Sequence, residues 1–286
     1  MAKPLIECVP NFSEGRREAV IESIMAPFKE TAGCYLFDYR ADSDHNRLVV
    51  SLVGEPEPIQ QALLQAAQTA KAAIDMNRHQ GGHPRIGAVD VIPFTPLQGI
   101  TMEECVALAH DFGQRFFDHT GIPVYFYEAA AKTPQRKRLE VIRKGQYEGL
   151  KEAVEQPERQ PDVGPSALHA TAGATVVGAR KFLVAYNINL ATSDISVAKR
   201  IAEAVRASSG GLRHVKGIAL SLEERGMVQV SLNVVDYEKN PLYRVQEMVR
   251  LEARRWGVEV AEAEVYGMIP AAALLESAAY YLQLAG

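Results

Sequence analysis

Residues 215–235 read VKGIALSLEERGMVQVSLNVV. Two runs with alternating apolar residues flank a short turn that ends in Gly226, and this pattern predicts a β-hairpin. Apolar periodicity on both sides of the hairpin predicts further elements. The expected elements are a strand at 182–189, a helix at 194–207 capped by Ser193 or Asp194, a helix at 242–256 and a strand at 258–265. The order strand, helix, strand, strand, helix, strand is that of the ferredoxin-like split βαβ fold.

The first part of the chain repeats this order and then extends it. The expected strands are 5–12, 34–39, 47–53, 88–94 and 122–127, and the expected helices are one between Ser13 and Gly33 and others at 57–74, 101–119 and 135–155. A loop of small residues is expected at 156–173. We therefore predict an α+β protein with two ferredoxin-like subdomains, residues 1–180 and 181–286, which have mixed or antiparallel sheets and a cleft between them.

Composition excludes several classes of function. The chain has 31 basic and 35 acidic residues, a net charge of −4 and a pI near 6.0. A nucleic-acid or membrane-surface binder usually needs a basic excess, so neither partner is expected. The N-terminus lacks the apolar core of a signal peptide. Cys8, Cys34 and Cys105 lie far apart among apolar neighbours, which favours free buried thiols and a cytoplasmic location.

The densest polar cluster is residues 75–85, DMNRHQGGHPR. Histidine suits proton transfer near neutral pH, and arginine suits recognition of carboxylates. The cluster therefore indicates a site for an anionic substrate, although a polar surface loop is an equal alternative. His79 and His83 are also four residues apart, as metal ligands on a helix can be. The intervening glycines and the lack of a third ligand weigh against a metal, and none is expected.

Two further segments are candidates. Residues 162–171 are too small and polar to form a core, and their amides and hydroxyls suit a polar heterocycle or a phosphate. A plain connector is the alternative. Residues 44–47, DHNR, favour a tight turn that can also aim His45 and Arg47 into a cleft. The basic residues of 135–155 are typical of a solvated helix face, and the alternative is that they add positive potential for a multiply charged ligand.

These segments together resemble the glutamate formimidoyltransferase (formiminotransferase) family, which includes the N-terminal part of bifunctional formimidoyltransferase–cyclodeaminase. The resemblance covers about residues 6–275. Its motifs are ECVPNFSEG at 7–15, IDMNRHQGGHPRIGAVD at 74–90, PDVGPSALHATAGAT at 161–175 and GARKFLVAYNINL at 178–190.

The resemblance implies transfer of a formimino group from N-formimino-L-glutamate to N5 of tetrahydrofolate, a step of histidine breakdown, by a homodimer. It implies that His83 is the general acid/base. The folate-contacting segment falls on Asp162, Val163, Gly164, Pro165, Ser166, Ala167, Leu168, His169, Ala170 and Thr171. For the substrate carboxylates we expect Arg78 or Arg85, with His79 and Arg47 as second candidates.

Two departures from the animal members affect substrate choice. Gly82 stands where they carry an acidic residue. Without that negative charge, the pKa of His83 is expected to be lower. Ala172 stands where they carry tryptophan, so a stacking partner for the pterin is lost. The alternatives are a formyltransferase using 5-formyltetrahydrofolate, a folate carrier without transfer activity and a metal-dependent hydrolase using His79 and His83.

Overall fold

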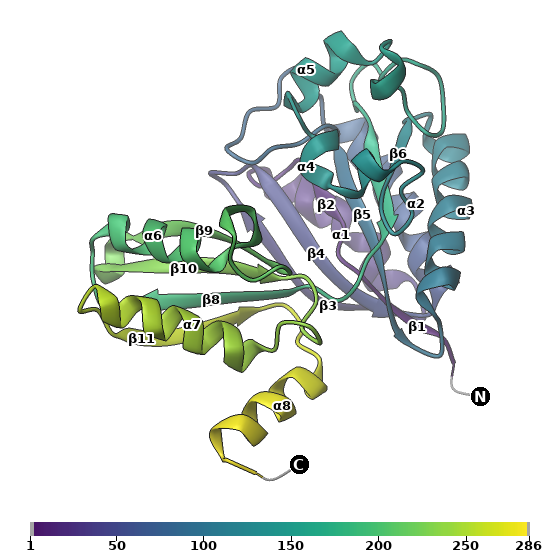
Figure 1. Cartoon of the computed structure of the whole chain (residues 1–286). Helices are drawn as coiled ribbons and strands as arrows, with labels where there is room; N and C mark the ends of the chain where they lie inside the picture. The colour runs from purple at the N-terminus through teal and green to yellow at the C-terminus, as the bar shows by residue number, and fades with distance from the viewer. Residues whose placement is uncertain (1–2, 285–286) are drawn as a thin grey trace. The chain divides into compact units, whose positions relative to one another are not determined.

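The computed structural model describes residues 3–284, except for the side chain of Glu224. The chain divides into two compact units, Met1–Arg180 and Lys181–Gly286. Figure 1 shows the elements of each unit. Within the described residues, no helix combines the length and the apolar character that a membrane crossing requires.

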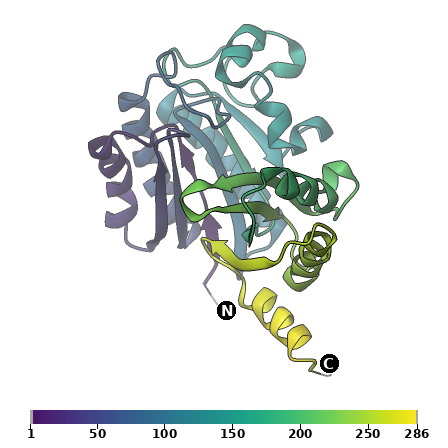
Figure 2. The ribbon, with the colours of Figure 1, turned by 90° about the vertical axis from the view of Figure 1, so that its left-hand side faces the viewer.

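The second unit contains the predicted ferredoxin-like order. Its elements are β8 (Val184–Leu190), α6 (Ile195–Val205), β9 (Val215–Leu222), β10 (Met227–Val234), α7 (Leu242–Arg255), β11 (Val260–Tyr266) and a closing α8 (Ala271–Tyr281). The antiparallel sheet has the order β11-β8-β10-β9, and α6 and α7 cover the same face of it (Figure 2). The hairpin prediction is confirmed, and Asp194 caps α6 by accepting a hydrogen bond from the Ser196 amide.

The first unit has the same order of strands and helices as the second and adds two more strands, which gives a mixed sheet. Its elements are β1 (Leu5–Cys8), β2 (Asn11–Phe12), α1 (Glu18–Glu30), β3 (Cys34–Asp42), β4 (Arg47–Gly54), α2 (Pro56–Ala73), β5 (Val89–Gln98), α3 (Met102–Thr120), β6 (Val124–Glu128), α4 (Leu139–Ile142), α5 (Gln146–Ala153) and β7 (Thr175–Ala179). Both β1 and β2 lie between β4 and β5, whereas β7 lies between β5 and β6 and runs parallel to them. The α+β class predicted from the sequence is confirmed.

Three local predictions were wrong. Ser13 does not cap α1, because its hydroxyl donates to the Gly87 carbonyl and the helix begins after Arg17. The single helix expected at 135–155 is broken, since Gly145 adopts a left-handed conformation with φ 82° between α4 and α5. No strand was expected directly after the loop at 156–173, but β7 begins at Thr175 and is only five residues long.

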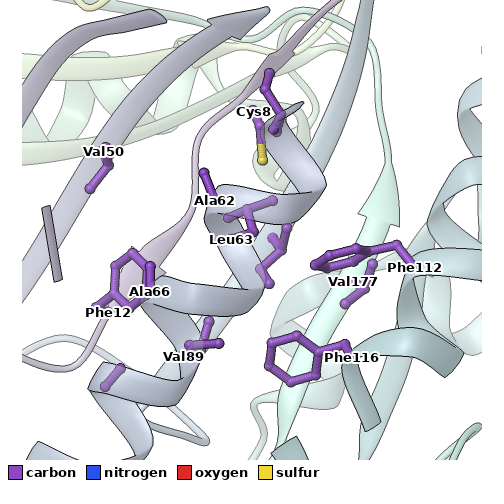
Figure 3. Packing of buried hydrophobic residues seen from close by; sticks show 14 of the residues in the cluster. Cys8, Phe12, Val50, Ala62, Leu63, Ala66, Val89, Phe112, Phe116 and Val177 are labelled. Atoms are coloured by element: carbon purple, nitrogen blue, oxygen red, sulfur yellow. The ribbon is translucent and has the colours of Figure 1, made fainter. Parts of the chain in front are cut away.

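Two layers of side chains cover the sheet of the first unit. Its main core lies under α1, α2 and α3, and Figure 3 shows Phe112 and Phe116 of α3 beside Val177 of β7. A smaller cluster on α4, α5 and the strands includes Tyr125 and Tyr127. All three cysteines are free and buried, as predicted.

Glu7 of β1 is a buried carboxyl whose protonation should affect stability. It lies opposite Thr95 of β5 and is 4% exposed, and burial raises its pKa to about 7 against the opposing charge of Arg180. Because this pKa is higher in the folded than in the unfolded chain, the folded chain binds more protons between about pH 4.5 and 7. The free energy of unfolding should therefore fall as pH rises through that window.

We expect Glu7→Gln to remove this pH dependence. At pH 8 the variant should be more stable than the parent, by on the order of 2 kcal/mol. Urea unfolding at pH 5 and pH 8 measures the difference, with the exposed Glu30→Gln as control. An unchanged slope of stability against pH in Glu7→Gln would contradict the assignment.

Candidate functional site

His83 lies in the loop between α2 and β5, and a second loop holds this one in place. The Met76 amide donates to the Thr171 carbonyl at 2.7 Å, and the Ala88 amide donates to the Ala172 carbonyl at 2.9 Å. A Cβ at Gly87 would lie 2.0 Å from the carbonyl oxygen of Ala174, so glycine is needed there for the close approach. The segments 75–88 and 169–174, far apart in sequence, thus form one structure.

The turn between β3 and β4 supports the other side of the His83 loop. The Gly82 amide donates to the Asp44 carbonyl at 3.1 Å, and the Asn46 side chain donates to the Gln80 carbonyl at 3.0 Å. A Cβ at Gly81 would lie 2.1 Å from the His45 carbonyl oxygen. Both interpretations of residues 44–47 hold, because they form a turn and also bring His45 beside His83.

His83 carries a neutral imidazole in this environment. Burial and, after it, the nearby positive charges of Arg47 and Arg143 together lower its pKa to about 3. The direction agrees with the expectation from Gly82, but the causes are burial and these arginines. The His45 ring lies edge-on to His83 at a centroid distance of 6.1 Å. A neutral imidazole can accept a proton directly.

Arg143 is a residue of this site that the sequence analysis missed. Its guanidinium pairs with the buried carboxylate of Asp90, 53 residues away, and its Nε has no hydrogen-bond partner among the described residues. Asp90 also accepts a hydrogen bond from the Ile86 amide at 2.8 Å. The residue lies between α4 and α5, where a solvated helix face was expected and positive potential for a charged ligand was the alternative.

Arg47 completes the positive surroundings of His83. Its Nε donates to the Asn11 side-chain oxygen at 2.8 Å. Burial and the charge of Arg143 lower its pKa to about 10. Two arginines held close together in a partly buried region favour a negatively charged ligand.

Arg85 and His79 hold the loop rather than face a ligand. Arg85 is 6% exposed and forms two parallel hydrogen bonds with Glu148, at 2.7 and 2.9 Å. Its Nε donates to Nδ1 of His79 at 3.1 Å, and its remaining donors reach the His79 carbonyl and the Gln146 amide oxygen. Since all the N–H donors of Arg85 are used in these hydrogen bonds, it has little capacity to bind a substrate carboxylate.

Both ring nitrogens of His79 are also occupied. Its Nε2 lies 2.9 Å from the Asn46 carbonyl, which can only accept, so Nε2 carries the hydrogen and Nδ1 accepts from Arg85. Burial lowers the pKa of His79, which favours this neutral form. Among residues 3–284 no group of three potential metal-ligating side chains (His, Cys, Asp or Glu) comes together.

Arg78 is the exposed arginine of the loop. Its side chain lies 3.7 Å from Asp75 and borders a cavity of about 350 Å³, a size suited to a small ligand. Arg16 and Arg17 also line this cavity, and Arg17 is paired with Glu14. The cavity wall includes His79 and Asn46, which also line the small cavity beside His83.

The predicted folate segment is anchored at its beginning and exposed in its middle. Asp162 accepts from the Phe126 amide at 2.8 Å and pairs with Arg136 at 2.8 Å, and Val163 forms a β-bridge with Val124. The exposed stretch that follows, with its backbone and one hydroxyl open to solvent, comprises Gly164, Pro165, Ser166 and Ala167. These four residues are therefore open to a ligand, although the Ala167 amide already donates to the Pro165 carbonyl at 2.7 Å.

The end of this segment has a structural role. Leu168 packs against both clusters of the unit. Nδ1 of His169 accepts hydrogen bonds from the amides of Thr171 and Ala172, at 3.3 and 3.1 Å, and the Ala170 carbonyl accepts from Asn77. Burial and the charge of Lys71 lower the pKa of His169.

Ala172 is fully buried in the main core. The side chain at this position therefore faces the core and not a stacked ligand. The alanine in place of tryptophan at this position therefore changes the packing of the core.

The chain matches known proteins along its length. Residues 5–180 match the model of the N-terminal subdomain of the formiminotransferase domain, and residues 185–285 match the model of the formiminotransferase domain. A glutamate formimidoyltransferase of Streptococcus pyogenes is 46% identical, covering 99% of this chain and 95% of that protein. The glutamate formimidoyltransferase of Thermoplasma acidophilum is 47% identical, covering 99% and 93%.

A longer relative matches over half its length. The formimidoyltransferase–cyclodeaminase of Mus musculus is 46% identical over 97% of this chain, which spans 52% of that protein. Matches of this identity over nearly the whole of two proteins, together with both domain models, identify the family. This chain belongs to the formiminotransferase family.

Proposed function

We propose that this protein is a glutamate formimidoyltransferase, which moves the formimino group of N-formimino-L-glutamate to N5 of tetrahydrofolate. The observation that carries the proposal is His83, held neutral beside Arg47 and Arg143 in a chain that matches glutamate formimidoyltransferases over 99% of its length. Folate is a co-substrate in this reaction, which belongs to histidine breakdown in this proposal.

The reaction exchanges one carbon–nitrogen bond for another. N5 of tetrahydrofolate attacks the formimino carbon, and a tetrahedral adduct with three nitrogens forms. The bond to the glutamate nitrogen then breaks. N5 loses one proton and the glutamate nitrogen gains one, so the products are 5-formiminotetrahydrofolate and L-glutamate. The protein must therefore position both substrates and move one proton.

His83 is suited to remove the N5 proton because it is neutral before the substrates bind. A pKa near 3 makes it a weak base as long as no anion lies beside Arg47 and Arg143. The donor is an anion with two carboxylates. A carboxylate next to these arginines offsets their charge and raises the pKa of His83 toward the working range. Binding of the donor thus prepares the base.

For the donor carboxylates, the charges support Arg78 over Arg85. Arg78 is exposed beside a cavity that Arg16 also lines, whereas Arg85 is fully engaged with its own neighbours. For the folate, the exposed backbone at 164–167 offers amides and carbonyls to a polar heterocycle. Arg47 serves as a charge beside His83.

An assay with two donors tests the proposal. Purified protein is mixed with tetrahydrofolate and N-formimino-L-glutamate, and 5-formiminotetrahydrofolate is followed by absorbance. We expect turnover with this donor and much slower transfer between 5-formyltetrahydrofolate and glutamate. Faster transfer with the formyl pair would identify a formyltransferase instead. Folate binding without product from either pair would identify a carrier.

The setting proposed for the enzyme is a homodimer in the cytoplasm. The three free, buried cysteines support a reducing compartment. The small negative net charge supports small-molecule substrates over nucleic acid or membrane surfaces. Light scattering after gel filtration measures the mass, and a particle of twice 31.4 kDa is expected.

A further inference from the structure

Asp42 and His45 form a carboxylate–imidazole pair at the edge of the site. Nδ1 of His45 donates to Oδ2 of Asp42 at 2.8 Å, and the His45 amide donates to Oδ1 at 2.8 Å. The pKa of Asp42 is lowered: partial burial opposes the change, but the hydrogen bonds from His45 outweigh it. The carboxylate therefore stays ionised and fixes both the tautomer and the orientation of the ring.

The ring of His45 is directed at His83. Their centroids lie 6.1 Å apart with the planes at 85°, and Cδ2 of His45 would lie 3.5 Å from a Cβ at Gly82. The His45 side chain is half-exposed, so its ring is open to a ligand that binds beside it. An acidic residue in place of Gly82 would occupy this space.

A cavity of about 10 Å³ borders both rings. His45 and His83 line it together with Asn11, Arg47 and Asp90. This volume accommodates a single water molecule, and its polar wall offers enough hydrogen-bonding partners for one. A water there can pass a proton from one imidazole to the other.

We propose that His45, oriented by Asp42, is the second proton-transfer group of this site, which gives the departing glutamate nitrogen its proton while His83 removes the proton of N5. The inference rests on the proposed formimino transfer. After each turnover His83 holds one extra proton and His45 lacks one. Passage of that proton through the intervening cavity restores both, so the proton count balances.

The charges around the pair favour this division of labour. An adjacent carboxylate stabilises imidazolium, whereas adjacent arginines destabilise it. His45 faces Asp42 and the turn that carries Asp44, whereas His83 faces Arg47 and Arg143. The other charged group packed on this turn is Arg16, whose Nε donates to the Ser43 carbonyl at 2.7 Å. One histidine is thus placed to supply a proton and the other to accept one.

His45→Gln and Asp42→Asn in the full chain test the inference. We expect His45→Gln to lower kcat by 10²-fold or more, with folate binding unchanged. The kcat of the parent should fall at high pH, where the proton donor for the leaving nitrogen is lost, and this limb should be absent in the variant. Asp42→Asn should keep more activity than His45→Gln, because the imidazole remains and loses only the carboxylate that fixes its tautomer and orientation.

Matched controls separate a chemical role from a structural one. Two control variants are His119→Gln, at an exposed position of α3, and Asp38→Asn, on the same strand as Asp42. Both should retain the parent kcat and pH profile. Melting temperatures check that all variants fold. A His45→Gln enzyme with kcat within twofold of the parent, or with reduced kcat and the parent's pH limb, would overturn the inference alone. A parent silent with every donor would overturn the proposed function as well.

Discussion

Replacement of His83 by alanine is expected to lower turnover by about 10²–10⁴-fold, the usual contribution of a general acid/base. The side chain is small and only partly buried, and the backbone of its loop is held by bonds that the substitution leaves intact, such as the one from Gly82 to Asp44. The loss should therefore appear in kcat rather than in stability or folate affinity.

Steady-state kinetics with formiminoglutamate and tetrahydrofolate measure this loss. His119→Ala, an exposed histidine on α3, is the matched control and should behave like the parent. Added imidazole should restore part of the turnover of His83→Ala if only the ring is missing. A His83→Ala enzyme that keeps the parent turnover would refute the assigned role.

The substitution Arg143→Met should destabilise the protein by about 3–5 kcal/mol, the typical cost of removing one partner of a buried ion pair. Asp90 is 3% exposed and would remain buried without its positive partner. The same change removes a positive charge beside His83, so the pKa of His83 should rise. A stability loss combined with a more basic histidine distinguishes this site from an ordinary ion pair.

Urea unfolding and an NMR titration of His83 measure the two effects. The exposed Arg138→Met serves as control for the loss of one charge. The double variant Arg143→Met, Asp90→Asn should recover part of the stability, because it no longer leaves a buried carboxylate unpaired. If Arg143→Met had the same urea midpoint of unfolding as the parent, Arg143 and Asp90 would not form a buried ion pair in solution.

Much of the fold could be predicted because its signals are local. The alternating runs around Gly226 and the cap at Asp194 each depend on neighbouring residues, and both are present. β7 was missed because a five-residue apolar strand surrounded by small residues resembles a loop. Its place between β5 and β6 depends on contacts with distant segments.

The site was only partly predictable for the same reason. His83 was identified by its motif, whose role in this chain remains a prediction. Arg85 belongs to the same motif, yet its contact with Glu148 lies 63 residues away and commits it to structure. Arg143 has no motif, and its role follows only from the fold, which brings it to Asp90. A spacing pattern identifies a loop but does not tell which of its side chains are already occupied.

Transfer of a labelled carbon tests the central claim most directly. N-formimino-L-glutamate carrying ¹³C in the formimino group is incubated with tetrahydrofolate and the purified protein, and the labelled carbon is followed by NMR. The proposed function predicts that the signal moves to 5-formiminotetrahydrofolate while an equal amount of unlabelled glutamate appears, and that His83→Ala slows both. A label that stays on glutamate, with folate bound and the protein folded, would contradict it.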